Sequence, residues 1–215
     1  MKTPTLFIPA YLKEEVNEDK VKSILKELPT SLLVAYSIQY KHQAEKIKLI
    51  MSKYDKKITG FIQVLGCFKP NLTKFKHTQA ILLISNGRFH AVSLAQETGL
   101  PIYIYNLSEL HKISQDEIEA LKRKKKAAYM NYLNSKRIGI IVSTKPGQNR
   151  LKEAEKLKVQ LQKQNKEVYL FTTNNINLRE FENFNISCFI NTACPRLDFD
   201  SNKIINIWDL NFKDN

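Results

Sequence analysis

Short runs of apolar residues alternate with amphipathic segments along most of the chain. The runs at residues 32–37, 80–84 and 138–143 contain few polar side chains, as is typical of strands that are buried on both faces of a sheet. The segments between the runs carry their apolar residues at helical spacing. Strands that are joined by crossover helices form parallel sheets with right-handed connections. The pattern therefore predicts an α/β fold.

Each apolar run and each amphipathic segment gives one predicted element. The predicted strands cover residues 5–9, 32–37, 58–65, 80–84, 101–105, 138–143, 168–172, 187–191 and 204–208. The predicted helices cover residues 18–28, 43–54, 91–96, 115–133, 149–164 and 178–182. Asn17 is a suitable N-cap for the first helix, and Pro29 ends that helix.

The helix predicted at residues 115–133 is polar and rich in lysine, and we interpret it as a connector between two lobes. Ser114 and Glu117 have the spacing of a capping box at its start. The basic run at 122–126 is interpreted as the solvated face of this helix, with a docking patch as the alternative. The predicted domains are a first α/β lobe (residues 1–112), the connecting helix (113–136) and a second α/β lobe (137–215).

The two lobes look like copies of one another. Residues 32–37, a short polar turn and a lysine-rich helix match residues 138–143 and the segment that follows them. The predicted architecture is therefore two similar parallel-sheet lobes of the flavodoxin-like kind, joined by a helix.

The composition sets limits on the class of protein. The chain has 215 residues, of which 43% are hydrophobic and 26% are charged, as in ordinary soluble globular proteins. No apolar stretch approaches the roughly 18 residues of a membrane span, and the apolar run near the N-terminus is too short for a secretory signal. We therefore expect a cytoplasmic protein with no membrane partner. Three cysteines do not suggest a disulfide framework, so metal binding or simple burial is expected for them.

The net charge of +13 raises the question of a nucleic-acid partner. Arginine is scarce, however, and the lysines are spread along the predicted helices, often beside glutamates. This distribution is typical of a solvated surface, with an acidic partner or RNA as the alternative. We expect no nucleic-acid partner.

Two of the cysteines lie two and three residues beyond the ends of predicted strands. Cys67 comes after the strand at 58–65, and Cys194 comes after the strand at 187–191. The carboxyl ends of strands are where open α/β sheets bind ligands, so both thiols are predicted to be metal ligands. A half-buried structural thiol is the alternative for each. Cys188 shares a strand face with apolar residues and lies roughly 20 Å of extended chain from Cys194, so it is predicted to be a core residue.

Three further segments carry candidate ligand-binding groups. Arg196 lies two residues beyond Cys194, and a guanidinium is well suited to bind a carboxylate. The turns at 144–150 and 85–90 each join a strand to a helix, where exposed amides attract anions. Neither turn matches a dinucleotide or P-loop fingerprint, so an ordinary connecting loop is the alternative for each. His90 is the one histidine expected near a site, and His42, His77 and His111 are expected at the surface.

Taken together, these segments resemble the diphthamide biosynthesis family, 2-(3-amino-3-carboxypropyl)histidine synthase. The residues that carry the resemblance occur in the family's order along nearly the whole chain. They are Ser-Ile-Gln-Tyr-Lys-His at 37–42, Gln-Val-Leu-Gly-Cys at 63–67, Asn-Gly-Arg-Phe-His at 86–90, Gly-Gln-Asn-Arg at 147–150, and Asn-Thr-Ala-Cys-Pro-Arg at 191–196 with Asp198. The last motif is the most specific.

The resemblance implies an archaeal or eukaryotic cytoplasmic enzyme that binds a 4Fe-4S cluster and S-adenosylmethionine. Such enzymes generate a 3-amino-3-carboxypropyl radical and add this group to a histidine of translation elongation factor 2. The resemblance makes Cys67 and Cys194 cluster ligands. It places the following residues toward S-adenosylmethionine: Gly87, His90, Gln148, Arg150 and Arg196. No catalytic residue is assigned beyond the cluster, and the Cys-x3-Cys-x2-Cys run of ordinary radical enzymes is absent from the sequence.

Members of the family are dimers of three similar α/β domains, and each domain supplies one cluster cysteine. This chain matches the second and third domains only. We therefore expect a homo- or hetero-oligomer in which a separate chain carries the first domain and the third cysteine, as one part of a split synthase. A non-catalytic subunit or scaffold of such a synthase is the alternative, and a basic RNA-binding module is a third interpretation.

Overall fold

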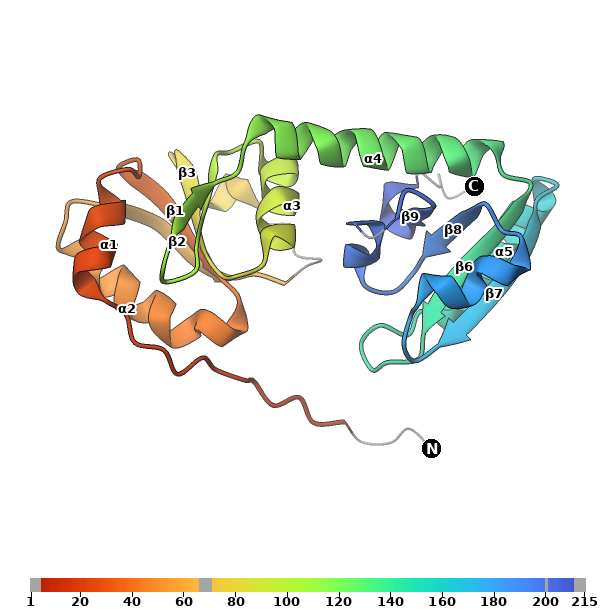
Figure 1. The fold of residues 1–215 in the computed structure, drawn as a ribbon, viewed down its shortest axis with the longest axis horizontal. Coiled ribbons are helices and arrows are strands. Elements are labelled where there is room, and N and C mark those ends of the chain that lie inside the picture. Colours follow the sequence, from red (N-terminus) through yellow and green to blue (C-terminus); the bar gives the residue numbers. More distant parts are fainter. Residues whose placement is uncertain (1–4, 66–70, 200, 211–215) are drawn as a thin grey trace. The chain divides into compact units, whose positions relative to one another are not determined.

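The most apolar strands of the sequence lie at the centres of two separate sheets (Figure 1). A computed structural model describes residues 5–65, 71–199 and 201–210. It divides the chain into two compact units, Met1–Ile118 and Glu119–Asn215, each of which contains one sheet. The boundary between the units falls within a single helix, α4 (Gln115–Asn134). The predicted fold class, two similar parallel-sheet lobes joined by a helix, is confirmed.

The sheet of the first unit has the strand order β2-β1-β3-β4-β5. Its strands are β1 (Ser31–Tyr36), β2 (Lys57–Gln63), β3 (Ala80–Ile84), β4 (Ile102–Tyr105) and β5 (Leu110–Lys112). The first four strands are parallel, and β5 pairs with β4 in the antiparallel sense. All residues of β1 and β3 are buried, because helices cover both faces of the sheet. The strand order 2-1-3-4-5 is that of the flavodoxin-like folds.

The helices of the first unit cover its sheet from two sides. They are α1 (Glu18–Leu25), α2 (Lys41–Ser52) and α3 (Arg88–Thr98), with short 3-10 turns at η1 (Ile38–Tyr40) and η2 (Leu72–Lys74). Val21 of α1 and Ile47 of α2 are fully buried against Leu32 and Val34 of β1. Figure 1 shows α3 on the opposite side of the sheet from α1 and α2. As predicted, the side chain of Asn17 caps α1 and accepts a hydrogen bond from the amide of Lys20 (3.0 Å).

The sheet of the second unit is wholly parallel and has the order β7-β6-β8-β9. Its strands are β6 (Arg137–Ser143), β7 (Glu167–Thr173), β8 (Cys188–Asn191) and β9 (Ile204–Asn206). On one face, α4 and α5 (Leu151–Lys163) bury Tyr132 and Leu157 against β6 and β8. On the other face lies an apolar cluster that includes Phe181 and Phe189. This face is covered by the 3-10 segments η3 (Leu178–Phe184) and η4 (Pro195–Phe199), and a further 3-10 turn, η5 (Ile207–Asp209), follows β9.

The predicted similarity of the two lobes is confirmed at the level of topology. The order β2-β1-β3-β4 in the first unit corresponds, strand for strand, to β7-β6-β8-β9 in the second. The lobe boundaries predicted at residues 112 and 136 remain a prediction. Among the described residues, no helix has the length and apolar character that crossing a membrane requires.

The structure departs from the sequence-based expectations about elements in three places. Residues 5–9 form no strand, and Leu6, Phe7 and Ile8 are 82%, 73% and 80% exposed, because the segment does not pair with the sheet and a strand needs a partner for its backbone groups. Strand β5 was missed because its three residues, Leu-His-Lys, have no apolar pattern. The last strand, predicted over residues 204–208, ends at Asn206, whereas the short helix predicted at 178–182 is present as the 3-10 segment η3.

Candidate functional site

Buried amide side chains hold the chain in place immediately after β8. Asn191, which is fully buried, donates hydrogen bonds from Nδ2 to the carbonyl of Cys194 (2.8 Å) and to Oδ1 of Asn206 (2.6 Å). Its Oδ1 accepts a hydrogen bond from the amide of Ala193 (2.9 Å). Asn206 in turn donates to the carbonyl of Pro195 (3.1 Å). These bonds fix the backbone of Cys194 just beyond the carboxyl edge of the sheet.

A second contact ties the same turn to the neighbouring strand. Thr192 is fully buried, and both its amide (3.1 Å) and its hydroxyl (2.8 Å) donate to the carbonyl of Ile141 in β6. Pro195 then begins η4, where the amide of Leu197 donates to the carbonyl of Cys194 (3.2 Å). Hydrogen bonds of the side chains of Asn191, Thr192 and Asn206 thus hold the backbone of residues 191–195 in place.

A pocket of about 210 Å³ opens at this edge of the second sheet. Its walls come from the residues that end or follow β6, β7 and β8. They are Ser143, Lys145, Gln148, Asn174, Ile176, Cys194, Arg196 and Leu197. Three predicted site residues, Gln148, Cys194 and Arg196, therefore lie together around one cavity, as expected from the rule that ligands bind at the carboxyl ends of parallel strands.

The chemistry of the pocket suits an anionic ligand group. Two of its lining side chains, Lys145 and Arg196, are cations, and none of the described residues that line it is a carboxylate. A guanidinium binds a carboxylate through two parallel hydrogen bonds. The volume is below the roughly 300–1,000 Å³ of pockets that enclose a drug-sized ligand, so this pocket would hold only part of such a ligand.

The turn after β6 presents Gln148 to the pocket. The amide of Lys145 donates to the hydroxyl of Ser143 (3.2 Å), and the amide of Gln148 donates to the carbonyl of Lys145 (3.0 Å). Gly147 has φ = +78°, which a residue with a side chain rarely adopts. The glycine thus permits the tight turn that brings Gln148 to the cavity.

Arg150 has other partners. Its Nη1 lies 3.1 Å from the carboxylate of Glu153, and its guanidinium lies 4.9 Å from the ring centroid of Trp208. It is absent from the residues that line the pocket. Its predicted contact with S-adenosylmethionine remains a prediction.

The two described cysteines have opposite environments. Cys194 is half-buried and lines the pocket, as a thiolate ligand must in order to reach a metal. Cys188 is fully buried in the core, where desolvation raises the pKa of its thiol to about 12 despite the nearby Lys166 cation. Cys188 is therefore a core residue, as the sequence predicted. Cys67 lies outside the described residues, and within the described part of the chain no three His, Cys, Asp or Glu side chains are grouped as metal ligands.

In the first unit, the turn after β3 holds Gly87 and His90. Gly87 is the N-cap of α3, and its amide donates to the hydroxyl of Ser85 (3.3 Å). A Cβ added to Gly87 would lie 3.0 Å from Nδ1 of His90, so the glycine lets the half-buried imidazole approach the backbone. The predicted contacts of both residues with a ligand remain predictions.

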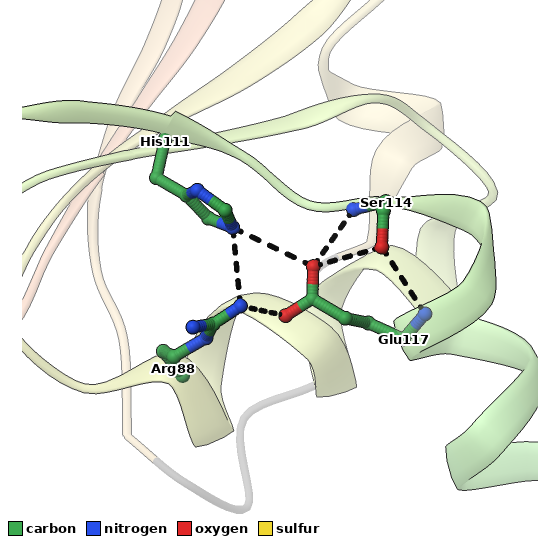
Figure 2. A network of polar contacts seen from close by, with 4 residues as sticks. All are labelled: Arg88, His111, Ser114 and Glu117. Carbon is green, nitrogen blue, oxygen red and sulfur yellow. Dashed lines mark hydrogen bonds and ion pairs between the residues drawn. The ribbon is translucent and has the colours of Figure 1, made fainter.

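A polar network next to this turn was only partly expected from the sequence. Figure 2 shows the carboxylate of Glu117 between Arg88, His111 and Ser114. It accepts hydrogen bonds from the amide (2.9 Å) and hydroxyl (3.0 Å) of Ser114, and the amide of Glu117 donates to the same hydroxyl (3.2 Å), which confirms the predicted capping box. The carboxylate also forms an ion pair with Arg88 and lies 3.5 Å from Nε2 of His111. That ring nitrogen of His111 is in turn 3.2 Å from Nη2 of Arg88.

The network controls the ionisation of Glu117. Partial burial by itself raises the pKa of this carboxyl, but the hydrogen bonds from Ser114 and Arg88 and the charge of Arg88 lower it to about 2. Glu117 is therefore charged over the whole physiological range. His111 was correctly expected at the surface, but its place beside a carboxylate and a guanidinium was missed, because it lies in β5, which has no sequence signal.

Two polar pocket residues were also missed, namely Ser143 and Asn174, whereas Lys145 lies in the candidate turn at 144–150. Their positions in the sequence could have identified them, because Ser143 ends β6 and Asn174 directly follows β7. Asn191 and Asn206 were likewise not identified as a pair, since they are fifteen residues apart and meet only through the pairing of β8 with β9.

The chain is similar to proteins of one kind. The sequence model of a family described as "Putative diphthamide synthesis protein" matches residues 1–205. The 2-(3-amino-3-carboxypropyl)histidine synthase of Pyrococcus horikoshii is 29% identical over 211 residues, which are 93% of this chain and 61% of that protein. The corresponding protein of Methanocaldococcus jannaschii is 30% identical over 204 residues, which are 91% of this chain and 56% of that protein.

Further relatives and solved structures agree with these matches. Subunit 1 of the synthase from Schizosaccharomyces pombe is 32% identical over 142 residues, which are 64% of this chain and 32% of that protein. The crystal structure of Dph2 from P. horikoshii has a TM-score of 0.74 at 25% identity, and that of Dph2 with a 4Fe-4S cluster has a TM-score of 0.75 at 25% identity. Both comparisons cover 91% of this chain and 61% of that chain, so this chain spans less than two thirds of the length of these relatives.

Proposed function

The chain belongs to the diphthamide synthesis family, and on this premise we propose that it takes part in the transfer of a 3-amino-3-carboxypropyl group from S-adenosylmethionine to a histidine of translation elongation factor 2, in the cytoplasm. The observation that carries the proposal is the pocket at the carboxyl edge of β6, β7 and β8. It combines an accessible thiol, an amide and two cations, which are the groups that a cluster and an amino-acid ligand need side by side.

Cys194 would hold a 4Fe-4S cluster at this edge. Cluster sites are built from thiolates, and three thiolates leave one iron open for a substrate ligand. When bound, the cluster would supply the electron that breaks a carbon–sulfur bond of the sulfonium. Cys194 fits the role because it is accessible and its backbone is fixed by Asn191. Cys67 is the second proposed ligand.

The pocket residues would bind the amino-acid part of S-adenosylmethionine. Arg196 would pair with its carboxylate, with Lys145 adding a second positive charge, and the carbonyl oxygen of Gln148 would accept a hydrogen bond from its ammonium group. This orientation would place the carbon–sulfur bond near Cys194. Gly87, His90 and Arg150 are proposed to contact the same molecule from other segments.

The third thiolate would come from a further α/β domain. The chain has three cysteines, and burial removes Cys188 from the candidates, so Cys67 and Cys194 leave one ligand position to be filled. The yeast relative is named as subunit 1 of a synthase, which indicates an assembly of more than one chain for that protein. We propose that the further domain is carried by a partner chain, in a split synthase.

Cysteine variants test the cluster assignment. The chain and its co-purifying partner would be reconstituted anaerobically with iron and sulfide, and iron content and the electron paramagnetic resonance spectrum would be measured. We expect Cys194→Ala and Cys67→Ala to lose the cluster, and the matched control Cys188→Ala to retain it, because the Cys188 side chain is enclosed in the core. Retention of the full iron content by Cys194→Ala would contradict the assignment.

The transfer itself is tested with S-adenosylmethionine that carries a carbon-14 label in the carboxyl group. We expect label to appear in elongation factor 2 only with the assembled synthase and a reductant, and not when the target histidine is replaced. If Cys67→Ala and Cys194→Ala assemble with the partner and transfer label at the wild-type rate, the chain is a scaffold rather than a catalytic subunit.

A further inference from the structure

Three apolar residues in succession are exposed ahead of the first helix. Leu6, Phe7 and Ile8 are 82%, 73% and 80% exposed and belong to no strand, and we call these three residues the exposed run. Figure 1 shows the chain before α1 as an extended trace. Single exposed apolar side chains need no explanation, but three in succession have the composition of a strand that is buried on both faces. Such a surface is typical of a contact with another protein.

The chain is tied to the first unit shortly after the exposed run. The amide of Leu12 donates to the carbonyl of Gln39 in η1 (2.8 Å). The side chain of Gln43 in α2, which is buried, donates to the carbonyls of Leu12 (3.0 Å) and Glu14 (2.7 Å). Residues 12–14 are therefore anchored on the first unit, and the exposed run next to them is not part of its core.

The exposed run lies before α1 where β4 lies before α4. In the sequence, Pro4 precedes the run and Pro101 precedes β4. The N-caps Asn17 and Ser114 each lie thirteen residues beyond these prolines, and the side chain of each accepts a hydrogen bond from the amide three residues further along. By this spacing, residues 5–8 correspond to the four residues of β4.

A strand at this place belongs to a different sheet from the helix that follows it. β4 pairs with β3 in the first sheet, whereas α4 packs Ala128 and Tyr132 against the second sheet. In the same way α1, which follows the exposed run, packs Val21 and Ile24 against the first sheet. The exposed run therefore corresponds to the last parallel strand of another α/β unit.

We propose that the exposed run completes the parallel sheet of a further α/β unit on the partner chain of the split synthase, an inference that rests on the proposed function. Backbone hydrogen bonds would hold the run beside the partner's strand, and helices of that unit would cover its side chains. The P. horikoshii synthase has room for such a unit, since 93% of this two-unit chain matches only 61% of that protein.

A second copy of this chain does not offer the required position. In the repeat, the last parallel strand pairs with the inner strand that corresponds to β3 or β8. In the first unit β4 already pairs with β3, and in the second unit β9 already pairs with β8. The position is open only in an α/β unit whose own chain lacks this strand, so a partner of that kind fits the run better than a second copy.

The hydrogen bonds of β4 show which of its residues face the inner strand. The carbonyl of Tyr105 accepts a hydrogen bond from the amide of Ser85, which directly follows β3 (3.1 Å). On the other side, the carbonyl of Ile102 accepts one from the amide of Ile113, which follows β5 (2.9 Å). Because successive residues of a strand direct their backbone groups to opposite sides, the odd-numbered residues of β4 face β3 and the even-numbered ones face away.

The same alternation applies to the exposed run. Leu6 and Ile8 correspond to the odd-numbered residues of β4, so their amides would donate to the partner's strand. Phe7 corresponds to an even-numbered residue, so its amide would point to the other side. Pairing of the backbone thus predicts a pattern of alternate amides, which a contact through side chains alone would not produce.

Residue-resolved hydrogen exchange tests the pairing in the complex of the full chain with its co-purifying α/β chain. We expect the amides of Leu6 and Ile8 to exchange at least about a hundredfold more slowly in the complex than in the chain alone, and the amide of Phe7 to change less. Protection of Phe7 alone, or of none of the three amides, would overturn the proposal.

Side-chain variants test the burial of the run, with the dissociation constant of the two chains as the measurement. We expect L6S/F7S/I8S to bind the partner at least about a hundredfold more weakly, because three apolar side chains lose their burial. The matched control L49S/L133S/V159S replaces three residues that are 66%, 49% and 53% exposed elsewhere, and it should bind within about threefold of the wild type. All six side chains are exposed, and circular dichroism would verify that both variants are folded.

Proline variants test the backbone hydrogen bonds separately. L6A removes the side chain alone, whereas L6P also removes the amide that would donate to the partner's strand. We expect L6P to bind about tenfold more weakly than L6A. T5P puts a proline at a position that faces away, and it should bind within about threefold of the wild type. Equal affinities of L6P and L6A would refute the pairing.

Further outcomes separate the other occupants and the proposed function. A dimer of this chain alone that L6S/F7S/I8S dissociates, as seen by light scattering, would assign the run to a second copy and overturn the proposal. So would a wild type that binds no α/β chain. If the run variants lose the partner but the wild-type complex transfers no label to elongation factor 2, the proposed function fails and the interface stands. If these variants bind the partner and transfer label as the wild type does, the interface fails and the proposed function stands.

Discussion

Replacement of Asn191 by alanine would remove three hydrogen bonds at the base of the candidate site. The bonds join Asn191 to Ala193, Cys194 and Asn206, and Asn191 itself is fully buried. At about 1 kcal/mol for each hydrogen bond, the expected loss in the free energy of unfolding is about 3 kcal/mol. Asn206→Ala would remove the bonds to Asn191 and Pro195, for a loss of about 2 kcal/mol.

Because the two asparagines share one bond, the double variant should lose about 1 kcal/mol less than the sum of the single losses. Urea unfolding can be followed through the fluorescence of Trp208, the only tryptophan, which lies in the second unit. Asn131→Ala is the control, since its hydrogen bond to Asn202 is exposed and alanine favours the helix, so its stability should stay within about 0.5 kcal/mol of the wild type. A loss below 1 kcal/mol for Asn191→Ala, or strictly additive losses, would refute the view that this pair fixes the turn around Cys194.

Three further predictions follow from single contacts. Glu117→Gln should lower the free energy of unfolding by about 1 kcal/mol at neutral pH, because the exposure of Arg88 limits the strength of its ion pair with Glu117. The folded pKa of Glu117, about 2, lies below the ordinary 4.5, so the stability difference from the wild type should shrink in thermal melts as pH falls from 4.5 toward 2. Iodoacetamide at mildly alkaline pH should alkylate Cys194 and leave Cys188 unmodified in the native protein, as read by peptide mass spectrometry, and modification of both at one rate would contradict the burial of Cys188. Gly139→Ala should destabilise the second unit by about 1–3 kcal/mol, because the new Cβ would lie 2.5 Å from the ring of Phe189, and urea unfolding at the wild-type midpoint would exclude this clash.

Most of the fold could be predicted because its strands are short and almost wholly apolar. Burial on both faces removes polar residues from β1, β3 and β6, so these strands stand out between amphipathic helices. The failures share a different cause. An apolar run such as residues 5–9 predicts burial but not pairing, and a three-residue polar strand such as β5 is created by its neighbour rather than by its own sequence.

The sequence could predict the site residues that come just after a strand, but not the residues that meet only because two strands pair. Cys194, Arg196 and Gln148 lie just beyond β8 or β6, so the topology brings them to one edge. The Asn191–Asn206 pair depends on the register of β8 with β9, and no local pattern in the sequence reveals that register.

The duplicated topology places equivalent arginines in different chemical roles. Ala35 pairs with Leu83 in the first sheet, and Ile141 pairs with Asn191 in the second. If residues 32–37 match 138–143, then Leu83 corresponds to Asn191, and five residues further along each chain segment Arg88 corresponds to Arg196.

The partners of these two arginines differ. The guanidinium of Arg88 forms an ion pair with the carboxylate of Glu117, whereas the described residues of the pocket that Arg196 lines include no carboxylate. The two cysteines do not occupy corresponding positions of the repeat. Cys67 comes after the edge strand β2, which corresponds to β7, whereas Cys194 comes after the inner strand β8. Duplication therefore accounts for the two scaffolds but not for the positions of the two proposed cluster ligands. Of the two corresponding arginines, Arg88 is therefore engaged within the fold, whereas Arg196 is the one that we propose pairs with the carboxylate of a ligand.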